Sequence, residues 1–72
     1  MPVSSFETLE FMSGWNQAVW EIEKYGLNHA QVILDRDLPD RVYNAYIAGK
    51  REAAKVSMVN NQLPMTAQEL FA

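Results

Sequence analysis

Apolar residues recur every three or four positions along the first third of the chain. They follow one another at steps of four, three, four and three in Phe11, Trp15, Ala18, Ile22 and Tyr25, and Met12 and Val19 widen the stripe. This spacing is typical of one face of an amphipathic helix. Ser4 and Glu7 form a capping box before the stripe, and Gly26 suits the left-handed position that follows a helix end. The pattern predicts a helix over residues 5–25 whose stripe faces the core.

Two further helices are predicted in the middle of the chain. Asn28 with Gln31 repeats the capping pattern and starts a short helix over residues 29–35. The following Asp37 is a good N-cap, and a proline at position 39 is tolerated in a first turn. A third helix is therefore expected over residues 39–60, ending at the polar pair 60–61 and at the Leu-Pro step of residues 63–64.

This third helix carries two apolar stripes. One is rich in small residues and comprises Val42, Ala45, Tyr46, Gly49, Ala53 and Val56, and the second comprises Tyr43, Ile47, Ala54 and Met58. Two stripes are typical of a helix that packs against two neighbours in a bundle.

Gly14 and Gly49 interrupt the first and third helices in similar local contexts, with an aromatic residue three positions earlier and an alanine four positions later. A glycine inside a helix costs about 1 kcal/mol relative to alanine. We interpret both glycines as points where another helix approaches closely; a faint internal duplication is the alternative.

The last residues repeat the helix-start signal. Thr66 and Glu69 form a capping box, and Met65 and Leu70 are spaced as a hydrophobic staple around it. We expect one helical turn over residues 67–71 that docks on the body of the protein.

These elements define an all-α three-helix bundle with a short C-terminal turn, in a single domain over residues 1–72. The composition, 49% hydrophobic and 21% charged, is that of a globular chain rather than a disordered one. A chain of this length buries only about 60% of its unfolded surface, so its core is small.

Several classes of chemistry are excluded or disfavoured. The absence of cysteine excludes disulfides, thiolate metal sites and cysteine nucleophiles, and a single histidine, His29, excludes a multi-histidine metal site. The cluster of Asp35, Asp37 and Asp40 lacks the glycine and ligand spacing of a calcium loop. No catalytic motif accompanies His29. We therefore expect a non-enzymatic protein without cofactor or metal.

The location expected from the sequence is the cytoplasm. No apolar run reaches the 18 residues that read as a membrane span. The first residues lack the basic and continuous apolar regions of a signal peptide.

Three apolar residues of the first helix, Phe6, Leu9 and Trp20, lie away from its core stripe. An exposed tryptophan among apolar residues is typical of a binding hot spot. Alternatives are that these residues are core, that Leu70 and Phe71 of the tail cover them, or that they form the self-complementary face of a homodimer.

Charge is distributed unevenly on this chain of net charge −3. Residues 1–23 contain four acids and no base, whereas residues 41–55 contain four bases and one acid. On the predicted third helix Arg41, Arg51 and Lys55 share one face. This basic stripe suits an acidic partner or phosphates; the alternative is a solvated face paired with the acidic first helix.

The stretch from Asp35 to Tyr46 reads acid-Arg-acid-Leu-Pro-acid, followed by an aliphatic and an aromatic residue. It resembles the theta subunit of bacterial DNA polymerase III and its phage-encoded relative. Extended without gaps, the resemblance covers about two-thirds of the chain and includes Tyr25, Ser57 and the Leu-Pro step. It implies a three-helix protein that binds and steadies the proofreading exonuclease subunit.

Other segments resemble other families. Tyr46, Ala48, Ala54 and Met58 match the register of nucleoid-associated Hha-type proteins, and the pattern F-x-x-G-W-N-x-A over residues 11–18 is similar to the opening helix of many small uncharacterised phage proteins. Residues 42–51 resemble the end of a repressor recognition helix, but the segment before them is too short for a helix-turn-helix.

The favoured function is a small protein-interaction module, of phage or mobile-element type, that inhibits or modulates a larger host protein. The predicted contacts are Phe6, Leu9, Trp20, Arg41, Arg51 and Lys55. Alternatives are a theta-like polymerase accessory subunit, a nucleic-acid binder using the third helix, and a structural homodimer. A small-molecule substrate is not expected.

Overall fold

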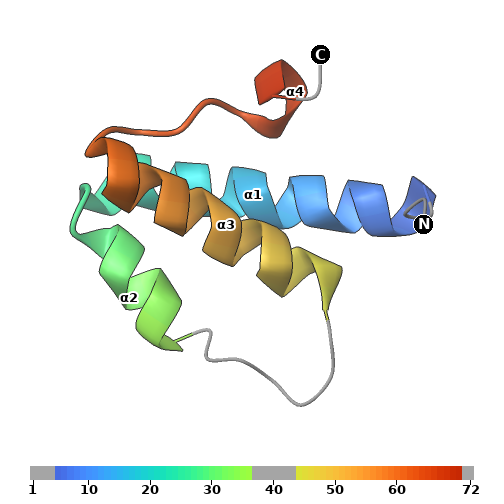
Figure 1. Cartoon of the computed structure of the whole chain (residues 1–72), viewed down its shortest axis with the longest axis horizontal. Helices are drawn as coiled ribbons and strands as arrows, with labels where there is room; N and C mark the ends of the chain where they lie inside the picture. Colours follow the sequence, from blue (N-terminus) through green and yellow to red (C-terminus); the bar gives the residue numbers. More distant parts are fainter. Residues whose placement is uncertain (1–4, 37–43, 71–72) are drawn as a thin grey trace.

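The computed structural model describes residues 5–36 and 44–70 and contains four helices in these ranges (Figure 1). They are α1 (Ser5–Tyr25), α2 (His29–Arg36), α3 (Ala45–Asn60) and α4 (Ala67–Leu70). No strand occurs in the described part of the chain. The prediction of a small all-α bundle is therefore confirmed.

The first two helices have nearly the predicted bounds. Gly26 ends α1 with a left-handed φ of 102°, and its N–H donates to Ile22 O at 2.8 Å. α2 starts as expected and extends one residue further, to Arg36. The Gln31 side chain does not complete the predicted box, because its amide donates forward to Asp35 Oδ1 at 2.9 Å. Ser4 lies outside the described residues.

The predicted start of the third helix at Pro39 is wrong. α3 begins at Ala45, because Asn44 has an extended backbone (φ −137°, ψ 117°) and caps the helix. The Asn44 side-chain oxygen accepts the N–H of Ile47 at 3.1 Å, which satisfies one free donor of the first turn. The expected cap Asp37 and the proline at position 39 lie outside the described residues.

The sequence signals that predicted the end of α3 and the C-terminal turn are confirmed. Asn61 adopts the left-handed conformation and donates its N–H to Ser57 O. Thr66 and Glu69 form the capping box: Glu69 N–H donates to Thr66 Oγ1 at 3.4 Å, while Thr66 N–H and Oγ1 donate to Glu69 Oε1 at 3.4 and 3.0 Å. The turn spans Ala67–Leu70, and Phe71 lies outside the described residues.

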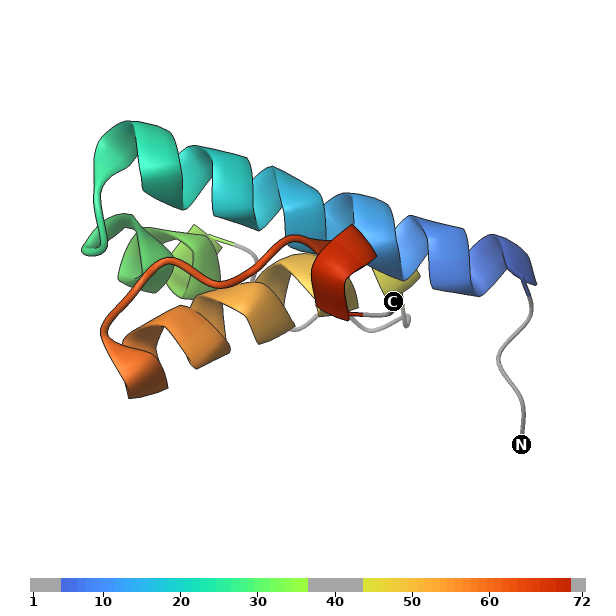
Figure 2. The same ribbon diagram turned by 90° about the horizontal axis from the view of Figure 1, so that it is seen from above.

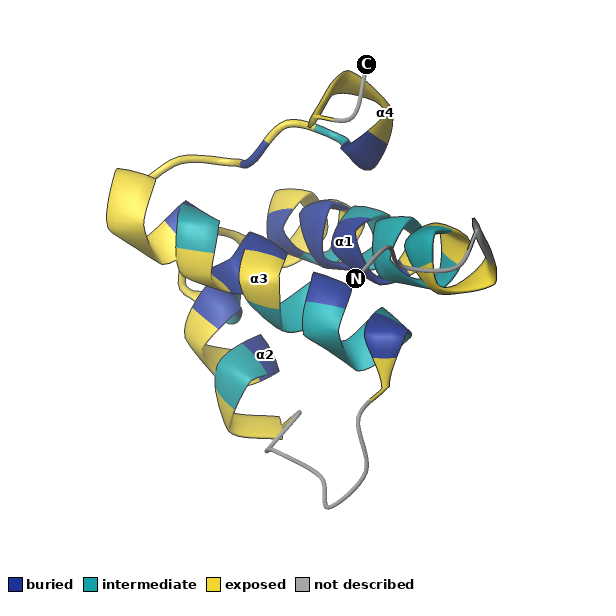
Figure 3. Cartoon of the chain, turned by 45° about the vertical axis from the view of Figure 1, so that its right-hand side comes forward, coloured by how far each residue is buried: buried dark blue, intermediate teal, exposed yellow. Residues whose placement is uncertain are grey.

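The core lies mainly between α1 and α3, which run in the same direction, with α2 packed on both and α4 on α1 (Figures 1 and 3). Its apolar members are Trp15, Ala18, Val19, Ile22, Ala30, Ile33, Ala53, Ala54 and Ala67. The stripe predicted on α1 is thus confirmed except at Tyr25, which is 60% exposed. Tyr25 is the last residue of α1, and its ring lies against His29 and Lys24 instead of in the core.

The C-terminal segment docks on α1 through its backbone. After α3 it runs back along the bundle to α4, on the side of α1 away from α2 (Figures 1 and 2). The Trp15 indole donates to Met65 O at 2.7 Å, and the Asn16 side chain accepts the Ala67 N–H at 2.7 Å. Docking of the turn is therefore confirmed. The proposed staple residues Met65 and Leu70 remain 52% and 43% exposed.

No helix among the described residues combines the length and apolar character needed to cross a membrane.

Candidate partner-binding surface

Trp20 is an exposed aromatic residue on the outer side of α1. Its side chain is 54% exposed, whereas Trp15 on the same helix is 3% exposed. The Lys24 ammonium lies one turn further on, 4.8 Å from the centre of the Trp20 ring and 5.4 Å from that of Tyr25. This cation–π geometry holds the two rings beside a positive charge.

A groove of about 540 Å³ runs beside Trp20, between α1 and α2. It is lined by Gln17, Trp20, Glu21, Tyr25, His29 and Arg36. The rings of Tyr25 and His29 meet at 4.9 Å between their centres and tie the end of α1 to the start of α2. Because its aromatic residues sit on packed helices, the shape of the groove is fixed by the fold. We call it the α1–α2 groove.

Glu21 connects all three long helices at the bottom of this groove. Its Oε1 lies 2.8 Å from His29 Nε2 of α2, and its Oε2 lies 3.2 Å from Lys50 Nζ of α3 and accepts from Gln17 at 2.9 Å. Partial burial acts to raise the Glu21 pKa, but the hydrogen bonds from His29, Gln17 and Lys50 and the charge of Lys50 outweigh it. The pKa is held below its ordinary value of 4.5.

Two exposed cations lie at or beside this groove, although the whole chain has a net charge of −3. The Glu21 carboxylate is ionised and matched by Lys50. Lys24 and Arg36 are exposed cations at the groove, and Arg36 forms no ion pair within the described ranges. Aromatic rings beside two exposed positive charges suit a partner that carries an apolar side chain next to carboxylates.

Phe6 and Leu9 are also exposed, at 72% and 62%, but they do not join Trp20 in one apolar patch. Phe6 and Trp20 lie about 21 Å apart along the helix axis, at about 1.5 Å per residue. The polar residues Ser13 and Gln17 occupy the same side of the helix between them. Phe6 instead lines a separate hollow of about 210 Å³ beside Asn44.

The described part of the C-terminal tail leaves Trp20 half-exposed, because α4 docks one turn earlier, at Trp15 and Asn16. Leu70 is itself 43% exposed.

Two of the three residues of the predicted basic stripe, Arg51 and Lys55, are described on α3. Arg41 lies outside the described residues. Arg51 is partly buried and donates from Nη1 to Leu34 O at 3.1 Å, which anchors the end of α2. Lys55 is exposed. Lys50, which is not part of the predicted stripe, pairs with the acidic first helix through Glu21.

Sequence reasoning missed the two charges beside Trp20. Lys24 follows Trp20 by four residues, a spacing at which helix side chains touch, so its position was available from the sequence. Arg36 and His29 reach the groove through the packing of α2 on α1, which no local pattern encodes.

The described residues include no group of three side chains arranged to hold a metal ion. His29 is engaged with Glu21 and Tyr25. No protein-family model, curated protein or solved structure matches the chain significantly.

Proposed function

We propose that this protein is a small non-enzymatic binding module whose α1–α2 groove holds an apolar side chain of a larger, acidic protein. The observation that carries the proposal is the half-exposed Trp20 ring beside Lys24 and Arg36. Tryptophan with neighbouring cations is typical of interface hot spots.

The energetics favour covering this ring. A tryptophan presents roughly 200 Å² of side-chain surface, so covering the exposed half removes about 100 Å² from water. At about 25 cal/mol per Å² this contributes about 2.5 kcal/mol, which is the size of a hot-spot contact.

The proposed mechanism is steric: the module covers a functional surface of its partner or stabilises one state of it. The resemblance of residues 11–18 to small phage proteins supports an inhibitor or modulator of a host protein as the form of this function. Phe6 and Leu9 extend the contact if the partner covers the whole outer side of α1.

Affinity capture from cells of the natural host, with variants, tests the proposal. Immobilised wild-type protein and Val59→Ala, which alters an exposed apolar residue outside the groove, should enrich the same protein. Trp20→Ala should lose it while keeping the helical circular dichroism spectrum. Equal enrichment by Trp20→Ala, or no enriched protein, would overturn the site assignment.

The sequence-based alternatives stay predictions with their own tests. The theta-like alternative requires co-purification with a proofreading exonuclease subunit. Binding of nucleic acid through α3 requires affinity for DNA that weakens steeply with salt and with Arg51→Glu. A structural homodimer requires dimers in sedimentation at micromolar concentration.

A further inference from the structure

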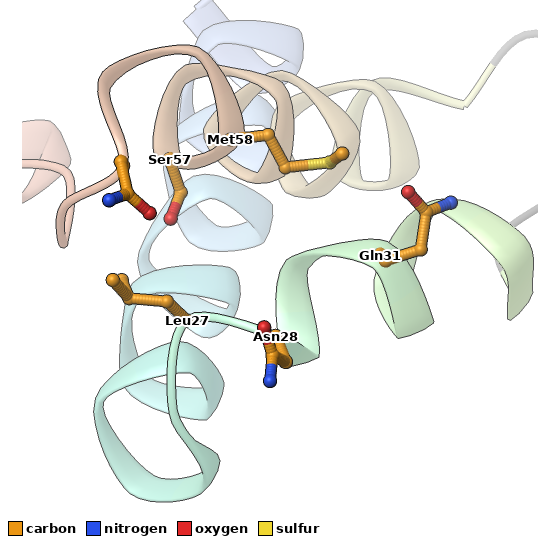
Figure 4. A pocket seen from close by; sticks show the side chains of 6 residues that line it. Leu27, Asn28, Gln31, Ser57 and Met58 are labelled. Carbon is orange, nitrogen blue, oxygen red and sulfur yellow. The ribbon is translucent and has the colours of Figure 1, made fainter.

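A second cleft lies between the first turn of α2 and the last turns of α3, apart from the α1–α2 groove (Figure 4). Its volume is about 410 Å³, within the range of small-molecule sites. It is lined by Leu27, Asn28, Gln31, Ser57, Met58 and Asn61.

Ser57 places a buried hydroxyl in this cleft. The residue is 1% exposed, and its Oγ has no hydrogen-bond partner within the described ranges. Figure 4 shows the hydroxyl pointing from α3 toward Leu27. A buried polar atom without a partner destabilises the fold, so this hydroxyl favours a ligand that supplies the missing hydrogen bond.

The other polar groups of the cleft are uncharged. Asn28, Gln31 and Asn61 contribute carboxamides, and no ionisable side chain lines the cleft. The Gln31 amide nitrogen donates to Asp35, which leaves the Gln31 carbonyl oxygen to accept from a ligand.

The helix ends at the cleft do not supply charge either. The N–H groups of His29, Ala30 and Gln31, in the first turn of α2, already donate to backbone carbonyls at 3.0–3.2 Å. The Ser57 carbonyl, in the last turn of α3, already accepts from Asn61 and Gln62. The backbone therefore presents neither an anion site nor a cation site here.

Two partly exposed apolar side chains complete the lining. Leu27 is 40% exposed and Met58 is 46% exposed, so a ligand with an apolar body would cover both.

We propose that this cleft binds a small uncharged molecule that carries an amide group on an apolar body. A carboxamide presents N–H donors and a carbonyl acceptor side by side, which matches the Ser57 hydroxyl and the carboxamides of the lining. This site does not depend on the partner proposed for the α1–α2 groove.

Three probes with the same ring and different head groups test the class of ligand: cyclopentanecarboxamide, cyclopentanecarboxylate and cyclopentylammonium. Each is titrated into ¹⁵N-labelled full-length protein and followed by the backbone and side-chain amide signals. We expect the carboxamide to shift the signals of Asn28, Gln31, Ser57 and Asn61 with saturation. Stronger binding of either charged probe, or no saturable shift with the carboxamide, would overturn the proposal and leave a merely hydrated cleft.

Two serine variants separate binding from folding. Ser57→Ala removes the buried hydroxyl and should weaken carboxamide binding about five- to tenfold, the effect of one hydrogen bond, without lowering the melting temperature. Ser13→Ala, which removes an exposed hydroxyl on α1, should leave the affinity unchanged. Equal affinities of the two variants would contradict the role assigned to Ser57.

Discussion

Gly14 and Gly49 lie at the crossing of α1 and α3, and each helix occupies the space that a side chain on the other would need. A Cβ atom on Gly14 would lie 1.8 Å from Tyr46 O, and a Cβ atom on Gly49 would lie 2.0 Å from Phe11 O. Phe11 and Tyr46 each precede the glycine of their own helix by three residues. The contact is thus reciprocal, and it brings the two backbones together along the core.

We expect Gly14→Ala to destabilise the protein by at least about 3 kcal/mol, although alanine normally favours a helix by about 1 kcal/mol. The added Cβ meets backbone, so the helices must separate until the contact reaches an ordinary 3.4 Å or more, which opens the core. Urea denaturation measures the loss. The neighbouring Ser13→Ala, on the exposed side of α1, should change stability by less than about 0.5 kcal/mol. Similar stabilities of the two variants would contradict the close crossing.

Glu21 should make the stability of the folded protein depend on pH in the acidic range. Its pKa is lowered in the folded state, so the ionised carboxylate contributes stability that is fully present above the unfolded value. This contribution is lost as the pH falls below about 4.5 and through the lower folded-state pKa. Glu21→Gln should be less stable than wild type by about 1 kcal/mol at pH 7, and the difference should shrink in acid.

Thermal unfolding from pH 7 to pH 3 checks this prediction. The exposed Glu52→Gln serves as a control that keeps the wild-type pH dependence. If the melting temperatures of wild type and Glu21→Gln differ by the same amount at every pH in this range, the carboxylate does not link the helices through its charge.

Asn16 should hold the C-terminal turn in place. Its Oδ1 accepts from Ala67 N–H, and its Nδ2 donates to Gln68 Oε1 at 2.9 Å. In Asn16→Ala, hydrogen exchange at the Ala67 amide should accelerate about tenfold, which corresponds to about 1.4 kcal/mol of local stability. Gln68→Ala keeps the Ala67 bond and should retain slow exchange. Unchanged protection in Asn16→Ala would refute this docking contact.

Lys24 should attract the partner. Lys24→Glu reverses the charge beside Trp20, so the association rate with an acidic partner should fall about tenfold at low salt and less at high salt. Surface plasmon resonance at two salt concentrations measures both rates. Lys55→Glu, at an exposed position of α3, should have a smaller effect. A larger effect of Lys55→Glu would favour the basic stripe predicted from the sequence.

Local signals predicted most of the fold. The stripe on α1, Gly26 at its end and the capping box of Thr66 with Glu69 all depend on residues within a turn or two of each other, so they can be recognised in the sequence. The start of α3 was missed because Asn44 and Asp37 are both good N-caps, and the local pattern does not choose between them.

The candidate site depends on packing and was predicted only in part. The position of Trp20 outside the core stripe made it a candidate for exposure, but burial in the core or under the tail stayed open, and the packing decides that it is 54% exposed. Its separation from Phe6 could have been derived from helix geometry alone. The links from Glu21 to His29 and Lys50 join residues from three helices, and these depend on how the helices pack.

The affinity of the captured partner for Trp20→Ala tests the central claim most directly. Isothermal titration calorimetry with the purified partner should show at least about 30-fold weaker binding for Trp20→Ala, equivalent to about 2 kcal/mol, and wild-type affinity for Val59→Ala. Unfolding measured on the same samples should show that Trp20→Ala keeps its fold. A Trp20→Ala affinity equal to that of wild type would contradict the assignment of the α1–α2 groove as the binding surface.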